Sequence, residues 1–403
     1  MTDQLMNDVP LRPGYLYDHD PAMARDFHNA WKQLSGGARA IRSDYRAGEG
    51  IDVWYLFDYE DVHWAVQHPE VFSSITIDHL ANPGDHRWIP EEMDPPEHTK
   101  YRQLLNWQFS PARMKALEPR MRQLCGELID RFAPKGRCDL MADFARLFPT
   151  TIFMELMGLP VEQSQTFLDW AHQLMHTPHG DDPEFAVRGA ANRQIRAYLD
   201  QLVDARRAEP RDDIVSYLLS SIVDGRPLDG AELQDMLFML YMAGLDTVAG
   251  MLGYTFRHLA ENPAHRAALL EDPGSITAAI EELLRYYAII TTSRVVAKDI
   301  EYAGCPMRAG DRVILPYPAA NRDGREFPEA DTFVIDRTPN RHVTFGAGPH
   351  RCAGSHLARL ELRFALEEWH KRIPDYGIPE GTSLRTEVWA VATLERLPLV
   401  WEP

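Results

Sequence analysis

The stretch Phe345-Gly346-Ala347-Gly348-Pro349-His350-Arg351-Cys352-Ala353-Gly354 decides what this chain can be. It runs directly into a helical pattern over residues 355–370, so a cysteine stands at the mouth of a helix, behind glycines and beside a histidine and an arginine. Unpaired backbone N–H groups, the positive helix end and the nearby cations all favour thiolate over thiol. A thiolate is a soft anionic ligand that suits iron. The glycines let the backbone pass close beneath a flat, bulky group, and Phe345 can shield the sulfur from water.

The alternative for this stretch is a buried structural cysteine after an ordinary loop, which needs neither glycines nor cations. The other cysteines, Cys125, Cys138 and Cys305, are too few for a disulfide framework and show no paired metal spacing. A reducing compartment fits this usage. We therefore expect Cys352 to be an iron ligand.

Composition describes a soluble protein with a sizeable core. The 403 residues are 45% hydrophobic and 25% charged, and the formal net charge is −18. That acidity argues against nucleic acid or an anionic membrane as the main partner. Residues 1–15 show no secretory signal, and the apolar run 236–251 is interrupted by Asp246 and Thr247, so we expect a buried helix rather than a membrane span. These features predict a cytoplasmic protein.

The periodicity predicts a mainly α-helical chain with small β-sheets, organised as a single domain over residues 1–403. Strand character is confined to the start and the last third, in the regions 40–60, 294–316 and 384–401, the first of them a hairpin. Helical spacing fills most of the remainder: residues 22–34, 98–132, 143–157, 162–176, 185–207, 228–261, 263–270 and 276–287.

A second signal is Glu281-Glu282-Leu283-Leu284-Arg285. Glu282 and Arg285 are three residues apart on one helical face, close enough for an ion pair. Arg337, between this helix and the cysteine loop, could complete a buried carboxylate–guanidinium network, because buried charges persist only when paired.

A third signal is Ala243-Gly244-Leu245-Asp246-Thr247, midway through the longest apolar helix. A glycine there costs about 1 kcal/mol relative to alanine and is tolerated where another group approaches the backbone closely. Thr247 can bond back to a carbonyl one turn earlier and loosen the helix into a groove. Opposite an iron, such a groove could bind dioxygen and relay protons; a close helix crossing with a satisfied threonine is the alternative.

These three motifs, in this order, resemble the signature of the cytochrome P-450 family, the haem-thiolate monooxygenases. The resemblance extends over nearly the whole chain and is strongest to bacterial, soluble, camphor-hydroxylase-like members. Met93-Asp94-Pro95-Pro96-Glu97 and Leu397-Pro398-Leu399-Val400-Trp401 match that group as well. The fold that the resemblance implies is a triangular prism of helices, with haem b between a long distal helix and the helix that follows the cysteine loop.

The resemblance also implies residue roles. Cys352 is the proximal ligand of the haem iron, Asp246 and Thr247 serve oxygen activation and proton delivery, and Glu282, Arg285 and Arg337 form a structural triad. The residues expected to bind the cofactor are His98, Arg102, Gly244, Arg294, Phe345, Gly346, His350 and Cys352. One departure is Thr292, where the camphor enzyme has an aspartate near a haem propionate.

The chain has no flavin or dinucleotide motif and no cysteine cluster for iron–sulfur ligation, so its electrons must come from other proteins. By resemblance these are a 2Fe–2S ferredoxin and its FAD-dependent reductase, acting on a monomer. An acidic ferredoxin needs a local basic patch to dock on this acidic chain. The patch candidates are Arg102, Arg113, Lys115, Arg351 and Arg359, each of which could equally belong to a solvated charged surface.

Alignment with the camphor enzyme gives the substrate-pocket candidates Ile77, His86, Trp88, Met239, Met242, Ile290, Thr291, Ala390 and Val391. Most are apolar or aromatic, which suits a small hydrophobic molecule of terpenoid size, such as a monoterpenoid or norisoprenoid. His86 stands where the camphor enzyme holds its ketone with a tyrosine, so camphor itself is disfavoured. His86 could instead be a surface residue on a mobile loop.

His172, His176 and His179 resemble a zinc site at first, but we expect solvated or capping histidines, since no ligand nearby completes the set. Three alternatives to ferredoxin-driven hydroxylation stay open. They are a peroxide-driven haem-thiolate enzyme, a family member that couples or cleaves a carrier-bound substrate, and a non-catalytic haem sensor or ligand carrier.

Overall fold

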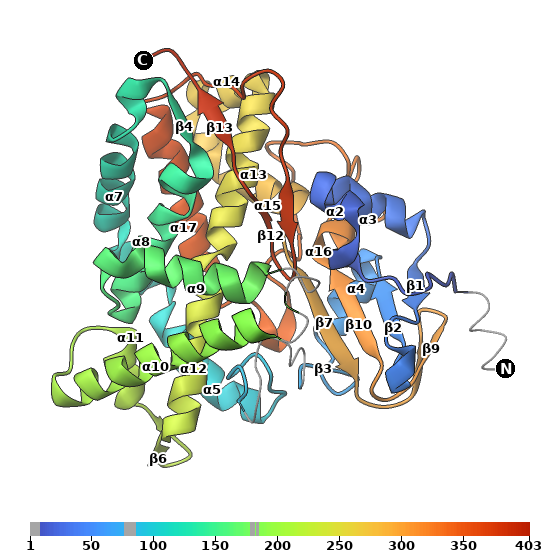
Figure 1. Ribbon diagram of the computed structural model, residues 1–403. Helices are drawn as coiled ribbons and strands as arrows, with labels where there is room; N and C mark the ends of the chain where they lie inside the picture. Colours follow the sequence, from blue (N-terminus) through green and yellow to red (C-terminus); the bar gives the residue numbers. More distant parts are fainter. Residues whose placement is uncertain (1–8, 76–85, 178–181, 183–184) are drawn as a thin grey trace. The chain divides into compact units, whose positions relative to one another are not determined.

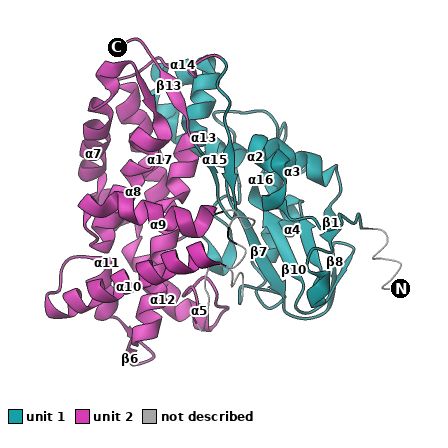
Figure 2. Cartoon of the chain, viewed as in Figure 1, with its two compact units in different colours: residues 1–77, 254–352, 381–395 teal, residues 78–253, 353–380, 396–403 magenta. Residues whose placement is uncertain are grey.

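The computed structural model describes residues 9–75, 86–177, 182 and 185–403. About 53% of the chain is helical and its sheets are small, which confirms the mainly α prediction (Figure 1). The chain divides into two compact units (Figure 2). Unit 1 comprises residues 1–77, 254–352 and 381–395, and unit 2 comprises residues 78–253, 353–380 and 396–403. Each unit is described on its own.

Unit 1 is built on a five-stranded sheet in the order β1-β2-β10-β7-β3. Its β2 pairs antiparallel with β1, Val53 opposite Ser43, and parallel with β10, Val53 opposite Arg312. All four residues of β2 are buried, because this strand lies inside the sheet and is covered on both faces. The predicted hairpin is thus confirmed, with β1 and β2 as its strands.

The elements of unit 1 are bounded as follows. Its strands are β1 (Ala40–Ser43), β2 (Val53–Leu56), β3 (Phe72–Ser73), β7 (Thr291–Val296), β8 (Ile300–Tyr302), β9 (Cys305–Met307), β10 (Arg312–Pro316), β11 (Thr386–Val388) and β12 (Ala392–Leu394). Its helices are α2 (Pro21–Arg25), α3 (Phe27–Ser35), α4 (Tyr59–Ala65), α14 (Pro263–Glu271), α15 (Ile276–Tyr286) and α16 (Tyr317–Ala320). The unit boundary falls within α13 (Thr247–Glu261).

Unit 2 is predominantly helical. Its helices are α5 (Glu97–Gln108), α6 (Pro111–Ala116), α7 (Glu118–Asp130), α8 (Leu147–Met157), α9 (Ser164–His176), α10 (Ala186–Ala208), α11 (Ile214–Leu219), α12 (Gly230–Leu245) and α17 (Ser355–His370). Two short antiparallel ladders pair β4 (Arg137–Asp139) with β13 (Pro398–Val400) and β5 (Ile222–Val223) with β6 (Arg226–Pro227). Strands at 137–139 and 222–227 contradict our expectation that sheets are confined to the ends of the chain.

Four predicted helices are interrupted. The one over 22–34 is split into α2 and α3 at Asp26, and the one over 143–157 begins as a π-helical turn and continues as α8 after Arg146. The helix expected over 98–132 is three helices, because Pro111 begins α6 after Ser110 and cannot donate the hydrogen bond that would continue α5. The helix expected over 228–261 ends at Leu245 and resumes at Thr247, with Asp246 outside helical geometry (φ −124°, ψ −29°). The interruption at Asp246 coincides with the polar residues that the sequence singled out.

One stretch, residues 230–261, has the length and composition of a membrane-crossing helix, with a mean hydropathy of 1.5. However, 67% of its most apolar window is buried within the protein. This burial is typical of the core helix of a soluble protein.

Candidate haem-thiolate site

The cysteine loop lies in unit 1 and is held by its own backbone. The N–H of Cys352 donates to the carbonyl of Phe345 (2.8 Å), which closes the loop just before α17 begins at Ser355. Gly346 and Gly348 both have positive φ, of 65° and 67°. A Cβ on Gly348 would lie 2.8 Å from the carbonyl oxygen of Val66, so this position requires glycine for packing as well as for conformation.

Cys352 is the exposed member of the four free cysteines; Cys125, Cys138 and Cys305 are buried. Burial raises the pKa of the Cys305 thiol to about 12 and raises the pKa values of Cys125 and Cys138 further. These three sulfurs therefore stay protonated and inert at neutral pH. Only the cysteine of the loop is placed to act as a thiolate ligand.

Arg294 of β7, also in unit 1, is a buried cation, 2% exposed. Among the residues that the structure describes no carboxylate pairs with it. Its guanidinium donates instead to the hydroxyl of Thr292 (3.1 Å) and the carbonyl of Ser293 (2.6 Å). A buried guanidinium is costly without an anion, so this side chain fits a carboxylate-bearing ligand such as a haem propionate.

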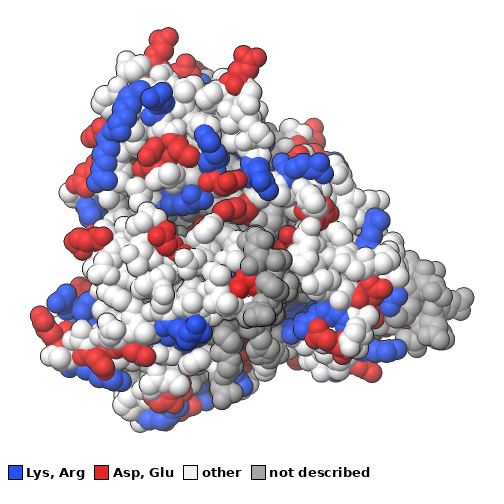
Figure 3. Space-filling view, viewed as in Figure 1, with Lys and Arg blue, Asp and Glu red and all other residues white. Residues whose placement is uncertain are grey.

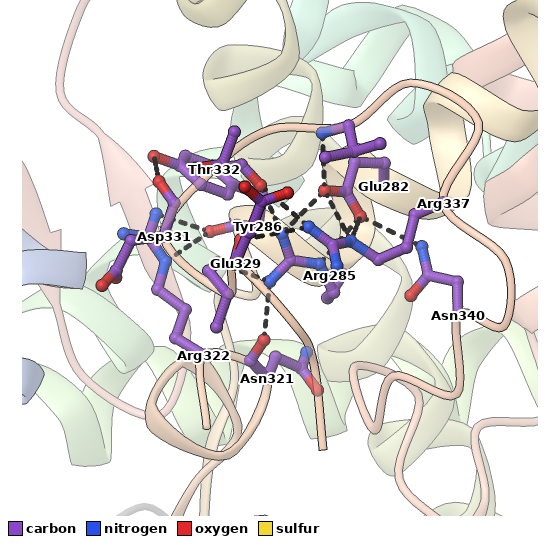
Figure 4. Close-up of polar contacts among 12 residues, drawn as sticks. Glu282, Arg285, Tyr286, Asn321, Arg322, Glu329, Asp331, Thr332, Arg337 and Asn340 are labelled. Carbon is purple, nitrogen blue, oxygen red and sulfur yellow. Dashed lines mark hydrogen bonds and ion pairs between the residues drawn. The ribbon is translucent and has the colours of Figure 1, made fainter. Parts of the chain in front are cut away.

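Glu282, Arg285 and Arg337 form a buried network in unit 1 (Figure 4). Arg285 donates to both oxygens of Glu282 at 2.7 Å, and Arg337 reaches the same carboxylate at 3.0 and 3.1 Å. Glu282 and Arg285 are fully buried. The remaining N–H groups of the two guanidiniums donate to backbone carbonyls of Asn321, Pro328, Glu329, Ala330 and Thr332.

This network fixes the loop between α16 and the cysteine loop against α15. Two residues that the sequence did not single out extend it: Asn321 accepts the N–H of Val343 (2.8 Å) and donates to the hydroxyl of Thr344 (2.8 Å). Thr344 in turn donates to the carbonyl of Leu284 (2.6 Å). The chain thus enters the cysteine loop from a rigid, hydrogen-bonded support.

The pocket candidates of unit 1 lie together. Ile290 bridges to Val391, and the N–H of Thr291 donates to the carbonyl of Ala390 (2.9 Å). Thr291 and Val391 are buried. The structure therefore brings these four predicted residues side by side. Ile77 lies outside the described residues.

In unit 2, the helix break at Asp246 is stabilised by two hydroxyls. Thr247 donates to the carbonyl of Ala243 (3.1 Å), which confirms the predicted bond to the preceding turn, and Thr150 of α8 donates to the carbonyl of Leu245 (3.3 Å). Side-chain hydroxyls thus replace part of the helical ladder where it is broken. The loosened turn is a property of the local sequence together with α8.

Asp246 pairs with a histidine that we expected to be solvated. The Nε2 of His176, the last residue of α9, lies 2.8 Å from Oδ2 of Asp246. The His176 side chain is only 4% exposed, and its ring stacks with His172 at 5.2 Å between centroids. The solvated interpretation of His176 is wrong, and a carboxylate does lie beside it. His179 is outside the described residues.

Gly244 is packed against α8. A Cβ at this position would lie 2.5 Å from the ring of Phe153, so the close approach that the glycine permits is that of a phenylalanine ring. A contact of Gly244 with the cofactor stays a prediction. His98 of α5 is 1% exposed, and Arg102, one turn later, donates to Asn106 (2.8 Å).

His86 does not present a free imidazole. Its Nδ1 lies 3.0 Å from Oδ1 of Asp235 on α12, a buried residue that the sequence did not single out. This contact holds the His86 ring, whose side chain is 38% exposed, so a surface position and a contact with substrate both stay predictions. Trp88, Met239 and Met242 belong to the same unit, and the ring of Trp88 lies 6.2 Å from that of Phe238.

Comparisons with known proteins identify the family of this chain. Residues 48–369 match the cytochrome P450 family. The chain is 38% identical to probable cytochrome P450 127A1 of Sinorhizobium fredii, over 89% of this chain and 85% of that protein. It is 36% identical to mycinamicin IV hydroxylase/epoxidase of Micromonospora griseorubida, over 89% of this chain and 92% of that protein. The crystal structure of CYP101J2 superposes with a TM-score of 0.84 at 30% identity, covering 97% and 98% of the two chains.

The chain therefore belongs to the cytochrome P450 family. It is a monooxygenase that uses haem b, takes its oxygen from O2 and depends on electrons from a redox partner.

Proposed function

We propose that this cytochrome P450 hydroxylates a small hydrophobic substrate, a monoterpenoid or norisoprenoid, with electrons from a 2Fe–2S ferredoxin and its FAD-dependent reductase. The observation that supports the haem site best is that unit 1 carries both an exposed loop cysteine and a buried arginine, Arg294, for which the described residues provide no carboxylate. The residue types are those that a thiolate-bound iron and a propionate need.

Each side chain has a role in this proposal. Cys352 holds the iron, and His98, Arg102, Arg294 and His350 bind the propionates, with Phe345, Gly346 and Gly244 against the macrocycle. Bound haem supplies the activation of dioxygen. The protein binds and orients the substrate, excludes water, and delivers protons through the carboxylate of Asp246 and the hydroxyl of Thr247. The triad of Glu282, Arg285 and Arg337 keeps the cysteine loop in place.

The substrate class rests on the apolar character of the pocket candidates. Met239 and Met242 on α12 and Ile290 and Val391 in unit 1 offer no charge to a ligand. Relatives named for mycinamicin IV and for steroid C26 oxidation act on larger molecules, so ligand size is the property to test first. Absorbance titrations with terpenoid and steroid panels measure it: a Soret shift with steroids and none with terpenoids contradicts this part of the proposal.

The electron donor would dock on a basic surface. On unit 2, Arg113 and Lys115 lie on α6, and the guanidinium of Arg113 covers the ring of Trp107 at 4.5 Å. Trp107 is 54% exposed and stacks on Tyr217, so this surface offers both charge and an aromatic contact. Figure 3 shows that acidic and basic side chains are interspersed over one face, so a basic patch has to be local.

The rate at which ferredoxin reduces the haem tests this docking surface. We expect a steep decrease with ionic strength for the native protein and a shallower one for Arg113→Gln. Arg131→Gln, on the exposed end of α7, is the matched control. A flat dependence in the native protein contradicts the patch. Arg102 and Arg359 of the same unit, and Arg351 of unit 1, are the further members to test.

Turnover separates this proposal from its alternatives. Product with a reconstituted ferredoxin system supports it; product with peroxide alone supports a peroxide-driven enzyme, and ligand binding without product supports a sensor or carrier. The decisive variant for the site is Cys352→Ser, which should lose the red-shifted Soret band of the ferrous–CO complex. An unchanged band overturns the ligand assignment. We further propose a single domain over residues 1–403 and a cytoplasmic monomer.

A further inference from the structure

Trp88 carries a buried hydrogen-bond donor that nothing in the described protein accepts. Its indole Nε1 is inaccessible to solvent, and no acceptor lies within hydrogen-bonding distance among residues 9–75, 86–177, 182 and 185–403. A buried N–H without an acceptor costs about 1–3 kcal/mol. Native proteins retain few such groups, and each calls for an explanation, of which a ligand acceptor is one.

The position of Trp88 is fixed through its backbone. Its N–H donates to the carboxylate of Glu92 (2.8 Å), and its carbonyl accepts the N–H of the same residue (2.8 Å). Glu92 is itself 5% exposed. The indole is therefore presented by a closed turn, so its donor has a defined direction before any ligand arrives.

A second anchor holds the chain just before Trp88. Asp235 of α12 accepts from Nδ1 of His86 (3.0 Å), from the backbone N–H of Arg87 (3.0 Å) and from Nη1 of Arg196 (2.8 Å). Asp235 and Arg196 are both buried, and the Arg196 guanidinium covers the ring of Phe238 at 4.2 Å. Because this carboxylate engages the imidazole, His86 is poorly placed to bind a substrate oxygen.

The anchor and the indole share one face of α12. Asp235, Phe238 and Met242 are spaced by three and four residues, so their side chains project from the same side of the helix, with Met239 beside them. The ring of Trp88 lies 6.2 Å from that of Phe238. The ring that carries the unsatisfied donor thus packs close to the face of α12 that bears Met242, one of the methionines expected to line the substrate pocket.

We propose that the indole N–H of Trp88 donates a hydrogen bond to an oxygen atom of the substrate, and that the enzyme selects hydrophobic molecules bearing a ketone, ether or hydroxyl oxygen. This inference rests on the proposed function, because it assumes that the ligand next to α12 is the substrate. The apolar residues of the pocket cannot recognise a substrate oxygen, and the N–H of Trp88 can. Asp235 and Glu92 act as positioning residues for this donor.

Trp31 of α3 provides a matched comparison. Its indole Nε1 is also buried without a partner among the residues that the structure describes, but it belongs to unit 1 and is not a pocket candidate. The variants Trp88→Phe and Trp31→Phe each remove one indole N–H and keep an aromatic ring. If a substrate oxygen is bound by the indole, only the first should alter the discrimination between oxygenated and hydrocarbon ligands.

Ligand pairs with and without the oxygen test the proposal in the haem-loaded protein. Dissociation constants are measured by Soret titration for a terpenoid ketone and for the hydrocarbon of the same skeleton, such as camphor with camphane and an ionone with its deoxygenated analogue. We expect a ketone to bind the native protein roughly tenfold more tightly than its hydrocarbon. Trp88→Phe should abolish most of this difference while hydrocarbon affinity stays within about threefold, and Trp31→Phe should preserve it.

Three results overturn the inference: no ketone preference with any pair in the native protein, a preference that survives in Trp88→Phe, or a preference abolished by Trp31→Phe. A normal ferrous–CO band in each variant shows that the haem site is intact. If the proposed function is wrong, the result is different: the native protein lacks that band or shows no Soret shift with any ligand.

An NMR measurement covers the case in which Trp88→Phe does not fold. The chain has nine tryptophans, so indole 15N labelling of the native ferrous–CO form gives few signals. We expect one indole N–H signal to move downfield on addition of the ketone and to remain in place with the hydrocarbon. If no indole signal distinguishes the two ligands, the hydrogen bond is absent and the inference is wrong.

Discussion

The Nε2 atom of His176 lies 2.8 Å from Oδ2 of Asp246, which joins the end of α9 to the break between α12 and α13. Both side chains are mostly buried, at 4% and 15% exposure. A carboxylate that delivers protons needs a defined orientation, and a buried imidazole donor supplies it. His176 is therefore expected to position Asp246 beside Thr247.

Replacing His176 with leucine should uncouple the enzyme. We expect the yield of hydroxylated product per electron to fall roughly tenfold, less than the ~100-fold that a proton-transfer group itself contributes. His176→Gln, which retains an N–H donor, should recover part of the yield. Peroxide release and the solvent deuterium isotope effect are measured together with product. Equal coupling in the native protein and in His176→Leu would show that the contact has no part in proton delivery.

Replacing Arg294 should weaken haem retention more than it changes the stability of the haem-free protein. Its guanidinium is buried, and no carboxylate in the described part of the chain pairs with it. Removing it therefore costs the haem-free protein little or stabilises it, whereas a bound propionate loses its partner. We expect Arg294→Gln to transfer haem to apomyoglobin roughly tenfold faster than the native protein. The thermal midpoint of the haem-free form should be unchanged or higher.

Arg131→Gln serves as the control for charge alone, because Arg131 is exposed. A rate of haem transfer from Arg294→Gln equal to that of the control would show that Arg294 does not bind the cofactor.

The sequence alone predicts those parts of the site that depend on residues close together in the chain. The cysteine loop, the pairing of Glu282 with Arg285 at a spacing of three, and the bond from Thr247 to the preceding turn all depend on neighbours within a few residues. The sequence predicts a loosened turn at Asp246 and Thr247, but not the division of the helix into α12 and α13, because the helical pattern continues on both sides.

Contacts between residues far apart in the chain could not be predicted from the sequence. Asp235 meets His86 across 149 positions and His176 meets Asp246 across 70, and both contacts depend on where helices pack in unit 2. The solvated interpretation of His176 is therefore wrong, and the carboxylate partner of His86 was missed, although both histidines had been noticed. Asp235 could have been suspected as an acid inside an apolar helix, since such a residue requires a partner.

Lysine should not be able to replace the guanidinium of Arg285. Lysine keeps the charge but cannot donate to both oxygens of Glu282 and to three carbonyls at once. We expect Arg285→Lys to lower the free energy of unfolding by about 3–5 kcal/mol. Arg257→Lys changes a part-exposed helical pair with Glu261 and should cost less than about 1 kcal/mol. Urea midpoints of the haem-loaded proteins measure both, and similar losses would contradict the structural role of the network.

Burial of His28 should make the folded protein less stable in acid. His28 in α3 is 5% exposed and its Nε2 bonds to the carbonyl of Ala288 (3.0 Å). Burial holds the pKa of His28 well below its usual value, so the folded protein keeps this ring neutral while the unfolded chain protonates it near pH 6.5. The stabilisation by His28 is therefore complete above about pH 6.5 and is lost progressively as the pH falls.

The variant His28→Gln, whose amide can still donate to Ala288, isolates this effect. Between pH 6.5 and 5 the native protein should lose about 1.4 kcal/mol more per pH unit than the variant. Glu361→Gln is the opposite control, because burial raises the pKa of Glu361, and stability from that group is present in acid and lost as the pH rises. Thermal midpoints measured at half-unit steps give the slopes. Parallel curves for the native protein and His28→Gln would mean that the histidine is charged in the folded state, and its burial against Ala288 could not then be the source of acid sensitivity.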